Sequence, residues 1–253
     1  NHGPIISDLL AGSRVFGRKY RKKLEASLSA TFLQARDTTP QAIYRLNQAK
    51  RLDDVLAALS KVSSPMLNVM FADKRGNIGF KASGWIPNRK KGTGFLSSPG
   101  WTGEYDWNGY IPFDVLPNSI NPPGEVLINA NNKIVSKSYP HFISRDWAEP
   151  YRAGRLRTLL ASKKKLSLFD FKNFQSDHVS EMALDMLSIL KAMTDWNDIP
   201  PVVRAVISTW DGQMKREGPA PLIFWAWFHE LIIGIFKDEL GSLFDEYANY
   251  RPS

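Results

Sequence analysis

The chain has 253 residues, and its 33 Lys and Arg against 25 Asp and Glu give a formal net charge of +8. That length suits one large domain or two small ones, because domains run to about 100–200 residues. Its 43% hydrophobic and 23% charged residues exclude disorder, collagen and coiled coil, and the absence of cysteine excludes disulfide frameworks, Cys-ligated zinc and a cysteine nucleophile.

The first half of the chain predicts mixed structure. It opens with Asn1-His2-Gly3-Pro4, without an initiator Met or an apolar leader, so we expect a fragment or a processed product. Pro40 stands at the first helical position after Thr39 and predicts a helix that continues through residues 41–49. A second helix is predicted over residues 52–59, whose apolar positions 52, 55, 56 and 59 fall on one face.

A β-hairpin is predicted next. Residues 66–72 and 78–82 are the strands, and residues 73–77 supply the turn between them. Residues 84–124 hold most of the Gly, Pro and Trp and predict a long loop, of the kind that is often functional. Residues 126–130 predict a last apolar strand, which leads into Asn131-Asn132.

From Tyr151 onward the pattern predicts helices, with no internal repeat, low-complexity run or linker. We therefore expect two parts of one larger fold, a strand- and loop-rich part over residues 1–150 and a helical lobe over 151–253. The predicted helices cover residues 151–162, 167–174 with Ser167 as cap, 181–193, 221–236 and 236–247.

Two basic clusters and one apolar segment are the features that could indicate a nucleic-acid or membrane partner. The basic residues at 14–23 have only Phe16 and Tyr20 among them, and Lys163 to Lys165 suit a helix end, so we expect solvated surfaces and no nucleic-acid partner. Residues 221–236 are apolar, but His229 and Glu230 interrupt them, which favours a buried helix and no membrane partner.

Few motifs carry chemistry by themselves. The four histidines, at positions 2, 141, 178 and 229, show no metal-ligand spacing, and neither a P-loop nor a Gly-x-Ser-x-Gly elbow is present. Asn131 and Asn132 follow an apolar strand, where a side-chain amide is a good donor to a developing oxyanion, although turn-forming asparagines are the simpler interpretation. Arg152, at a helix start, could orient such an amide or bind a carboxylate.

A series of short motifs resembles the penicillin acylase family of N-terminal-nucleophile hydrolases, in family order from residue 2 to about residue 240. The motifs are His2-Gly3-Pro4-Ile5, Phe71-Ala72-Asp73-Lys74-Arg75-Gly76-Asn77-Ile78-Gly79-Phe80, Gly84-Trp85-Ile86-Pro87, Gly100-Trp101, Tyr105-Asp106-Trp107, Gly109-Tyr110-Ile111-Pro112-Phe113, Asn121-Pro122-Pro123-Gly124, Asn129-Ala130-Asn131-Asn132, Tyr151-Arg152, Thr209-Trp210-Asp211-Gly212 and Ala220-Pro221-Leu222-Ile223-Phe224.

The resemblance implies an α+β fold, part of an αββα sandwich with antiparallel strands in residues 1–135 and a helical lobe in 151–250. It implies a self-cleaving precursor, a zymogen, whose large chain begins with a nucleophilic Ser that attacks an amide carbonyl, with its own α-amino group as base. In this family an Asn side-chain amide and a backbone N–H hold the oxyanion, and an Arg orients the site. By position these are Asn131 and Arg152.

The sequence departs from a complete enzyme of that family. Residue 1 is Asn instead of Ser, and His2-Gly3 matches a landmark well inside the large chain. We therefore expect an internal piece of the β-chain that lacks the nucleophile and is inactive alone. Its expected partners are a small-molecule amide substrate, the α-chain and the remainder of the β-chain. Exposed sheet edges could also join two copies edge to edge.

Further implications of the resemblance concern substrate, metal and location. Leu67 aligns with a wall of the acyl pocket and Tyr44 lies near another, although core packing explains both equally well. No cofactor is expected for catalysis. A structural calcium is possible in the full-length protein, but Asp146 is only the nearest acidic candidate, so no ligand is assigned. A periplasmic location is implied.

The expected activity is cleavage of the amide between an acyl group and an amine nucleus. The family's substrates are β-lactam side chains, which concern antibiotic synthesis or resistance, and acyl-homoserine lactones, whose cleavage quenches quorum signals. An alternative from another class is a secreted module whose eight tryptophans bind carbohydrate or another ligand without catalysis.

Overall fold

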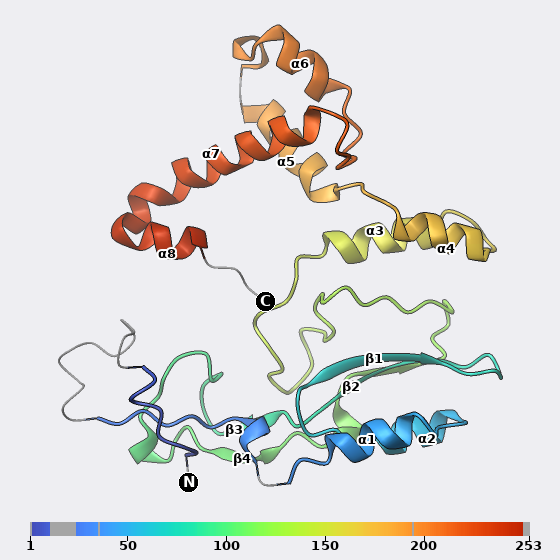
Figure 1. Ribbon diagram of the computed structural model, residues 1–253, viewed down its shortest axis with the longest axis vertical. Coiled ribbons are helices and arrows are strands. Elements are labelled where there is room, and N and C mark those ends of the chain that lie inside the picture. Colours follow the sequence, from blue (N-terminus) through green and yellow to red (C-terminus); the bar gives the residue numbers. More distant parts are fainter. Residues whose placement is uncertain (1, 11–23, 35, 194, 250–253) are drawn as a thin grey trace. The chain divides into compact units, whose positions relative to one another are not determined.

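A computed structural model describes residues 2–10, 24–34, 36–193 and 195–249 (Figure 1). The basic cluster at residues 14–23 lies outside these residues. Internal contacts divide the chain into two compact units, Asn1–Ala148 and Glu149–Ser253. The first unit combines small antiparallel sheets with helices and the second is helical, so the predicted α+β class is confirmed.

Two helices of the first unit pack against a β-hairpin (Figure 1). The helix α1 (Thr39–Leu46) begins at the predicted position, where Pro40 fixes a helical φ without the loss of a needed N–H, and α2 (Leu52–Leu59) has the predicted bounds. Their inward faces form one core with the hairpin. Its members are Ala42, Leu59 and Val62, with Leu46, Val55, Val69, Phe71 and Phe113 packed around them.

The hairpin consists of β1 (Leu67–Ala72) and β2 (Ile78–Ser83), which pair antiparallel as predicted, with Leu67 opposite Ser83. The unpredicted strand β5 (Asn118–Ile120) pairs with the other edge of β2, so the sheet order is β1-β2-β5. Gly84 follows β2 with a φ of +126°, and a Cβ there would come within 2.7 Å of the Met66 Cα. The position directly after β2 therefore requires glycine.

A second sheet lies where the sequence predicts only a loop. It pairs β3 (Pro87–Arg89) with β4 (Trp107–Tyr110). Trp85, just before β3, stacks on Tyr110, the last residue of β4, with ring centroids 5.0 Å apart, at the end of the sheet where Pro87 pairs with Tyr110. A core beside it is formed by Ala82, Ile86, Ile111 and Leu116, and single 3₁₀ turns occur at Thr31–Leu33, Gly100–Thr102 and Phe113–Val115.

The predicted strand over residues 126–130 is not present. The segment joins no ladder among the described residues. Glu125 and Asn131, with φ of 52° and 61°, place a left-handed residue on each side of it, so an extended backbone does not continue beyond residues 126–130. Residues 126–130 therefore form an apolar but irregular approach to Asn131.

Helices make up the second unit. The predictions for α3, α4 and α5 are confirmed, and Ser167 caps α4 by accepting a hydrogen bond from the Asp170 N–H. The helix α6, which begins at a Pro-Pro pair, was not predicted. The helices are α3 (Tyr151–Leu160), α4 (Leu168–Gln175), α5 (Glu181–Met193), α6 (Pro201–Ser208), α7 (Ala220–Leu240) and α8 (Phe244–Asn249), with 3₁₀ turns at Trp196–Asp198 and Gly241–Leu243.

The expectation that the apolar helix α7 is buried is wrong for this structure, in which only Ala220 and Phe224 of α7 are buried. By length and composition alone α7 could cross a bilayer, a property that the core helix of a soluble protein can share. The predicted helix over residues 236–247 is interrupted, since Gly241, with a φ of 50°, ends α7 and α8 starts separately at Phe244.

Candidate functional site

Asn131 stands at a strained point of the backbone in the first unit. Its φ of 61° is left-handed, a conformation that asparagine tolerates better than most residues because its short amide can bond locally. The residue is exposed, while its neighbour Ala130 is buried. The backbone thus turns sharply at Asn131 and presents this residue at the surface.

Local hydrogen bonds from neighbouring asparagines fix this turn. The Asn131 N–H donates to Asn129 Oδ1 at 3.3 Å, and the Ala130 N–H donates to Asn132 Oδ1 at 3.1 Å. The Asn131 carbonyl accepts a hydrogen bond from the Ala148 N–H at 2.9 Å. The side chains of Asn129 and Asn132 therefore accept hydrogen bonds from the backbone, and Asn131 is the exposed asparagine of the motif.

A shallow hollow of about 340 Å³ adjoins the turn, and Asn129 and Asn132 contribute to its lining. The Asn129 Nδ2 atom is buried and has no hydrogen-bond partner among the described residues. A buried amide donor without an acceptor is costly, so this atom is suited to an acceptor from outside the described residues. The remaining lining residues are Phe80, Ser119, Leu127, Ile128, Lys133, Ile134 and Val135.

Arg152 is exposed in the first turn of α3, in the second unit. One turn later Arg155 makes a two-pronged contact with Asp177, from Nε to Oδ2 at 2.9 Å and from Nη2 to Oδ1 at 2.6 Å. These hydrogen bonds raise the pKa of Arg155 and lower the pKa of Asp177. The charged pair fixes α3 to the segment before α5, and α3 carries Arg152.

The other predicted residues occupy separate elements of the first unit. Tyr44 lies on α1 and is 65% exposed, and Leu67 begins β1 and is 38% exposed. Neither lines the hollow beside Asn129. Asp146 is exposed, and among the described residues no group of three His, Cys, Asp or Glu could hold a metal ion. The residues present thus do not assemble a calcium site by themselves.

The tryptophans are used mainly in packing, which weakens the alternative of a binding module. Trp85 and Trp107 both contact Tyr110, and Trp210 packs on the buried Phe224. Only Trp101 and Trp225 are exposed, and they belong to different units. A carbohydrate platform needs adjacent exposed rings, and neither unit provides two exposed tryptophans.

Comparison with solved structures identifies the class of fold. The chain superposes on a thermostable penicillin G acylase from Alcaligenes faecalis with a TM-score of 0.67 and 21% sequence identity, over 81% of this chain and 39% of that one. The fold is thus that of the N-terminal-nucleophile hydrolases, as the motif order predicts.

Sequence comparison then identifies the family. The penicillin amidase family model matches residues 1–252, and the chain belongs to that family. It is 28% identical to the acyl-homoserine lactone acylase QuiP of Pseudomonas aeruginosa over 95% of this chain and 30% of the relative. It is 31% identical to a penicillin acylase 2 proenzyme of a Pseudomonas species over 60% of this chain and 20% of the relative. The chain spans less than a third of the length of these relatives.

Sequence reasoning missed the roles of Asn129 and Asn132 as supports of Asn131. Asn129 and Asn132 belong to the Asn-Ala-Asn-Asn motif, so their presence was visible, but their roles depend on the left-handed backbone of the residue between them.

Proposed function

We propose that this chain is part of an acylase that hydrolyses the amide between an acyl group and an amine-bearing nucleus. Family membership and the acylases among its relatives support this proposal. The observation that carries it is the exposed, left-handed Asn131, held in place by the side chains of Asn129 and Asn132. A side-chain amide carried on a fixed backbone is a good donor to an oxyanion.

In the proposed mechanism a serine outside these residues attacks the amide carbonyl carbon, and its proton passes to its own α-amino group. The Asn131 Nδ2–H donates a hydrogen bond to the oxyanion of the tetrahedral intermediate, and Arg152 orients the site. The C–N bond then breaks, the amine leaves with the proton, and an ester remains on the serine. Water attacks this ester and releases the carboxylic acid.

The substrate class of the proposal is acyl amides, either a β-lactam side chain or an acyl-homoserine lactone. Two of its relatives carry these two specificities in their names, an acyl-homoserine lactone acylase and a penicillin acylase. We propose that Leu67 and Tyr44, which are both accessible, contact the acyl group, and that the parent protein works in the periplasm. Fractionation of cells that express the parent gene tests this location.

The experiment that tests the function compares variants of the full parent protein. Because removal of one oxyanion donor typically costs about 10²–10³ in rate, Asn131→Ala should lower kcat by that factor and change KM little. The matched control is Asn88→Ala, at an exposed position of β3, which should keep the full rate. Equal rates for the wild-type and Asn131→Ala proteins would exclude Asn131 from catalysis.

We also propose that residues 1–253 alone have no amidase activity, because the nucleophile comes from another segment of the parent. Incubation of the purified chain with a penicillin and an acyl-homoserine lactone should release no amine. Turnover together with an acyl group on one of the chain's own serines, detected by mass spectrometry, would contradict this proposal. Restored activity on addition of the missing segments would support it.

A further inference from the structure

A cleft of about 440 Å³ in the first unit is rich in cationic side chains. One wall is the link between α1 and α2, with Lys50 and Arg51, and the other wall is the turn between β1 and β2, with Lys74 and Arg75. All four of these residues are exposed. Leu52, Val55 and Phe71 supply an apolar floor, and Asp73 is the only carboxylate in the lining.

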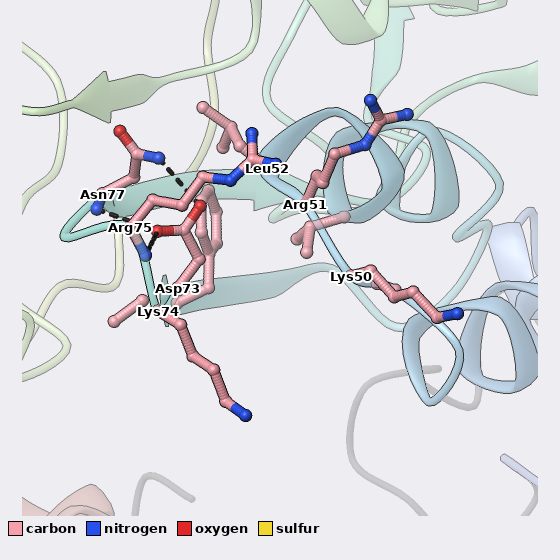
Figure 2. Close-up of a pocket in the computed structure, with 11 residues that line it drawn as sticks. Lys50, Arg51, Leu52, Asp73, Lys74, Arg75 and Asn77 are labelled. Carbon is pink, nitrogen blue, oxygen red and sulfur yellow. Dashed lines mark hydrogen bonds between the residues drawn. The ribbon is translucent and has the colours of Figure 1, made fainter.

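Figure 2 shows how the cations are distributed around this basic cleft. The side chains of Arg51 and Arg75 extend toward the same side of the cleft, and Lys50 and Lys74 lie toward the other. One wall contributes a lysine and an arginine, and so does the other. A ligand in the cleft would therefore meet positive charge from both walls.

The carboxylates of Asp73 and Asp54, one on each wall, accept hydrogen bonds from backbone N–H groups. Asp73 accepts hydrogen bonds from the Arg75 N–H at 2.8 Å, the Asn77 N–H at 3.0 Å and the Asn77 amide at 2.8 Å. On the opposite wall Asp54 accepts from the Lys50 and Arg51 N–H groups at 3.0 and 3.1 Å. The Arg51 guanidinium is 3.9 Å from Asp54, and an exposed pair at that distance is weak.

The same hydrogen bonds hold the two walls in a fixed geometry. The side chain of Asn121 extends the network of the turn, since its amide donates to Asn77 Oδ1 and its Oδ1 accepts from the Ile78 N–H, both at 2.9 Å. The carboxylates therefore order the backbone that carries the cations, and the four cations Lys50, Arg51, Lys74 and Arg75 outnumber Asp54 and Asp73. Preorganised walls reduce the entropy that a ligand must lose on binding.

We infer that this basic cleft binds a small polyanion, with phosphate or carboxylate groups, between its lysines and arginines. Guanidinium groups bind both anions through paired hydrogen bonds, and lysines add charge without fixed geometry. The apolar floor suits a ligand with a short uncharged body between or beside its anionic groups. The inference stands on the first unit alone and does not depend on the acylase proposal.

Calorimetric titration of the 253-residue chain at low salt tests this inference, with pyrophosphate and citrate as probes. At least one probe should bind in a saturable manner, with an affinity that falls as salt is added, because salt screens exposed charges. Binding of pyrophosphate alone would indicate that the cleft prefers phosphate groups, and binding of citrate alone would indicate that it prefers carboxylates. If neither probe binds, the inference is wrong.

Variants decide whether binding occurs in the cleft. Arg51→Gln/Arg75→Gln should raise the dissociation constant about tenfold or more, the effect of one lost charge-assisted hydrogen bond, and Lys50→Gln/Lys74→Gln should also weaken binding. The matched control, Arg157→Gln/Arg216→Gln, removes the same charge from exposed positions of the second unit and should bind as the wild type does. Equal weakening in the control, or unchanged binding in both cleft variants, would overturn the inference.

Discussion

Two charged residues, Lys81 and Asp170, are almost fully buried, with 3% and 7% of their surface exposed. Lys81 Nζ donates to the carbonyl oxygens of Phe113 and Leu116, at 2.8 and 3.0 Å, and lies over the Phe113 ring. Burial lowers the pKa of this lysine. Because Lys81 and Asp170 are both hydrogen-bonded, each fixes a neighbouring segment, and the cost of burying the polar group is reduced.

Asp170 makes the second unit less stable as the pH falls into the acid range. Hydrogen bonds from Lys163 and Ser167 lower its pKa from 3.8 to about 2, so its stabilising effect is complete above 3.8 and is lost as the pH falls through 2. Asp170→Asn should therefore lower the urea midpoint at pH 7, and the difference from the wild type should shrink between pH 3.8 and pH 2.

Urea unfolding across this pH range measures the effect. The control is Asp185→Asn, which changes an exposed carboxylate of α5 and should leave the midpoint close to that of the wild type at every pH. A deficit of Asp170→Asn that is the same at pH 7 and pH 2 would show that the ionised form is not the source of the stabilisation.

At the scale of elements, the shorter helices of the second unit, such as α3 and α4, depend on contacts with their neighbours. The helix α4 has a capping box, in which Ser167 and Asp170 satisfy each other's N–H groups. The helix α3 contacts α5, and Arg155 joins it to Asp177, in the segment between α4 and α5. Helices of eight to ten residues are marginal alone, so such links decide whether they form.

Loss of the Arg155–Asp177 pair should destabilise the second unit measurably. Asp177→Ala should lower the free energy of unfolding by about 2 kcal/mol, since hydrogen bonds to a charged group contribute about 1.5–3 kcal/mol each and this pair is partly exposed. Arg155→Lys keeps the positive charge but loses the paired hydrogen bonds of the guanidinium, so it should lower the free energy of unfolding by less. Chemical denaturation of both variants and of the double variant measures the coupling. Additive losses would mean that the pair does not interact.

At the scale of the whole molecule, the sheet of the first unit has an edge that can meet another chain. The strand β1 lies at one end of the order β1-β2-β5, and Met70 on β1 is 46% exposed. An edge strand with exposed apolar side chains offers unpaired backbone groups as a template for a further strand. This edge is the place where the expected pairing of two copies would form.

We expect the isolated chain to dimerise through β1 at high concentration. Sedimentation equilibrium should show a concentration-dependent increase in mass, and Met70→Lys should shift the equilibrium toward monomer because a charge on an edge strand opposes pairing. The control Met214→Lys lies outside the sheet and should dimerise as the wild type does. A monomer at all concentrations would contradict the expectation.

Local signals in the sequence predicted the elements whose formation depends on neighbouring residues. The hairpin of β1 and β2, the Pro-initiated α1 and the Ser167 cap of α4 depend on residues within a few positions of one another. The family followed from the order of short motifs, and the fold class followed from the family. The four predicted site residues remain predictions, and the Asn131→Ala variant described above tests one of them.

Tertiary contacts decided the rest, because they join residues that are distant in the chain. The sheet of β3 and β4 pairs Pro87 with Tyr110, on which Trp85 stacks, and β5 pairs with an edge of β2. The sequence alone thus determined the Asn-Ala-Asn-Asn motif and its family. Only the folded chain determined that residue 131 is left-handed and exposed, since that conformation depends on two side-chain amides and on the Ala148 N–H.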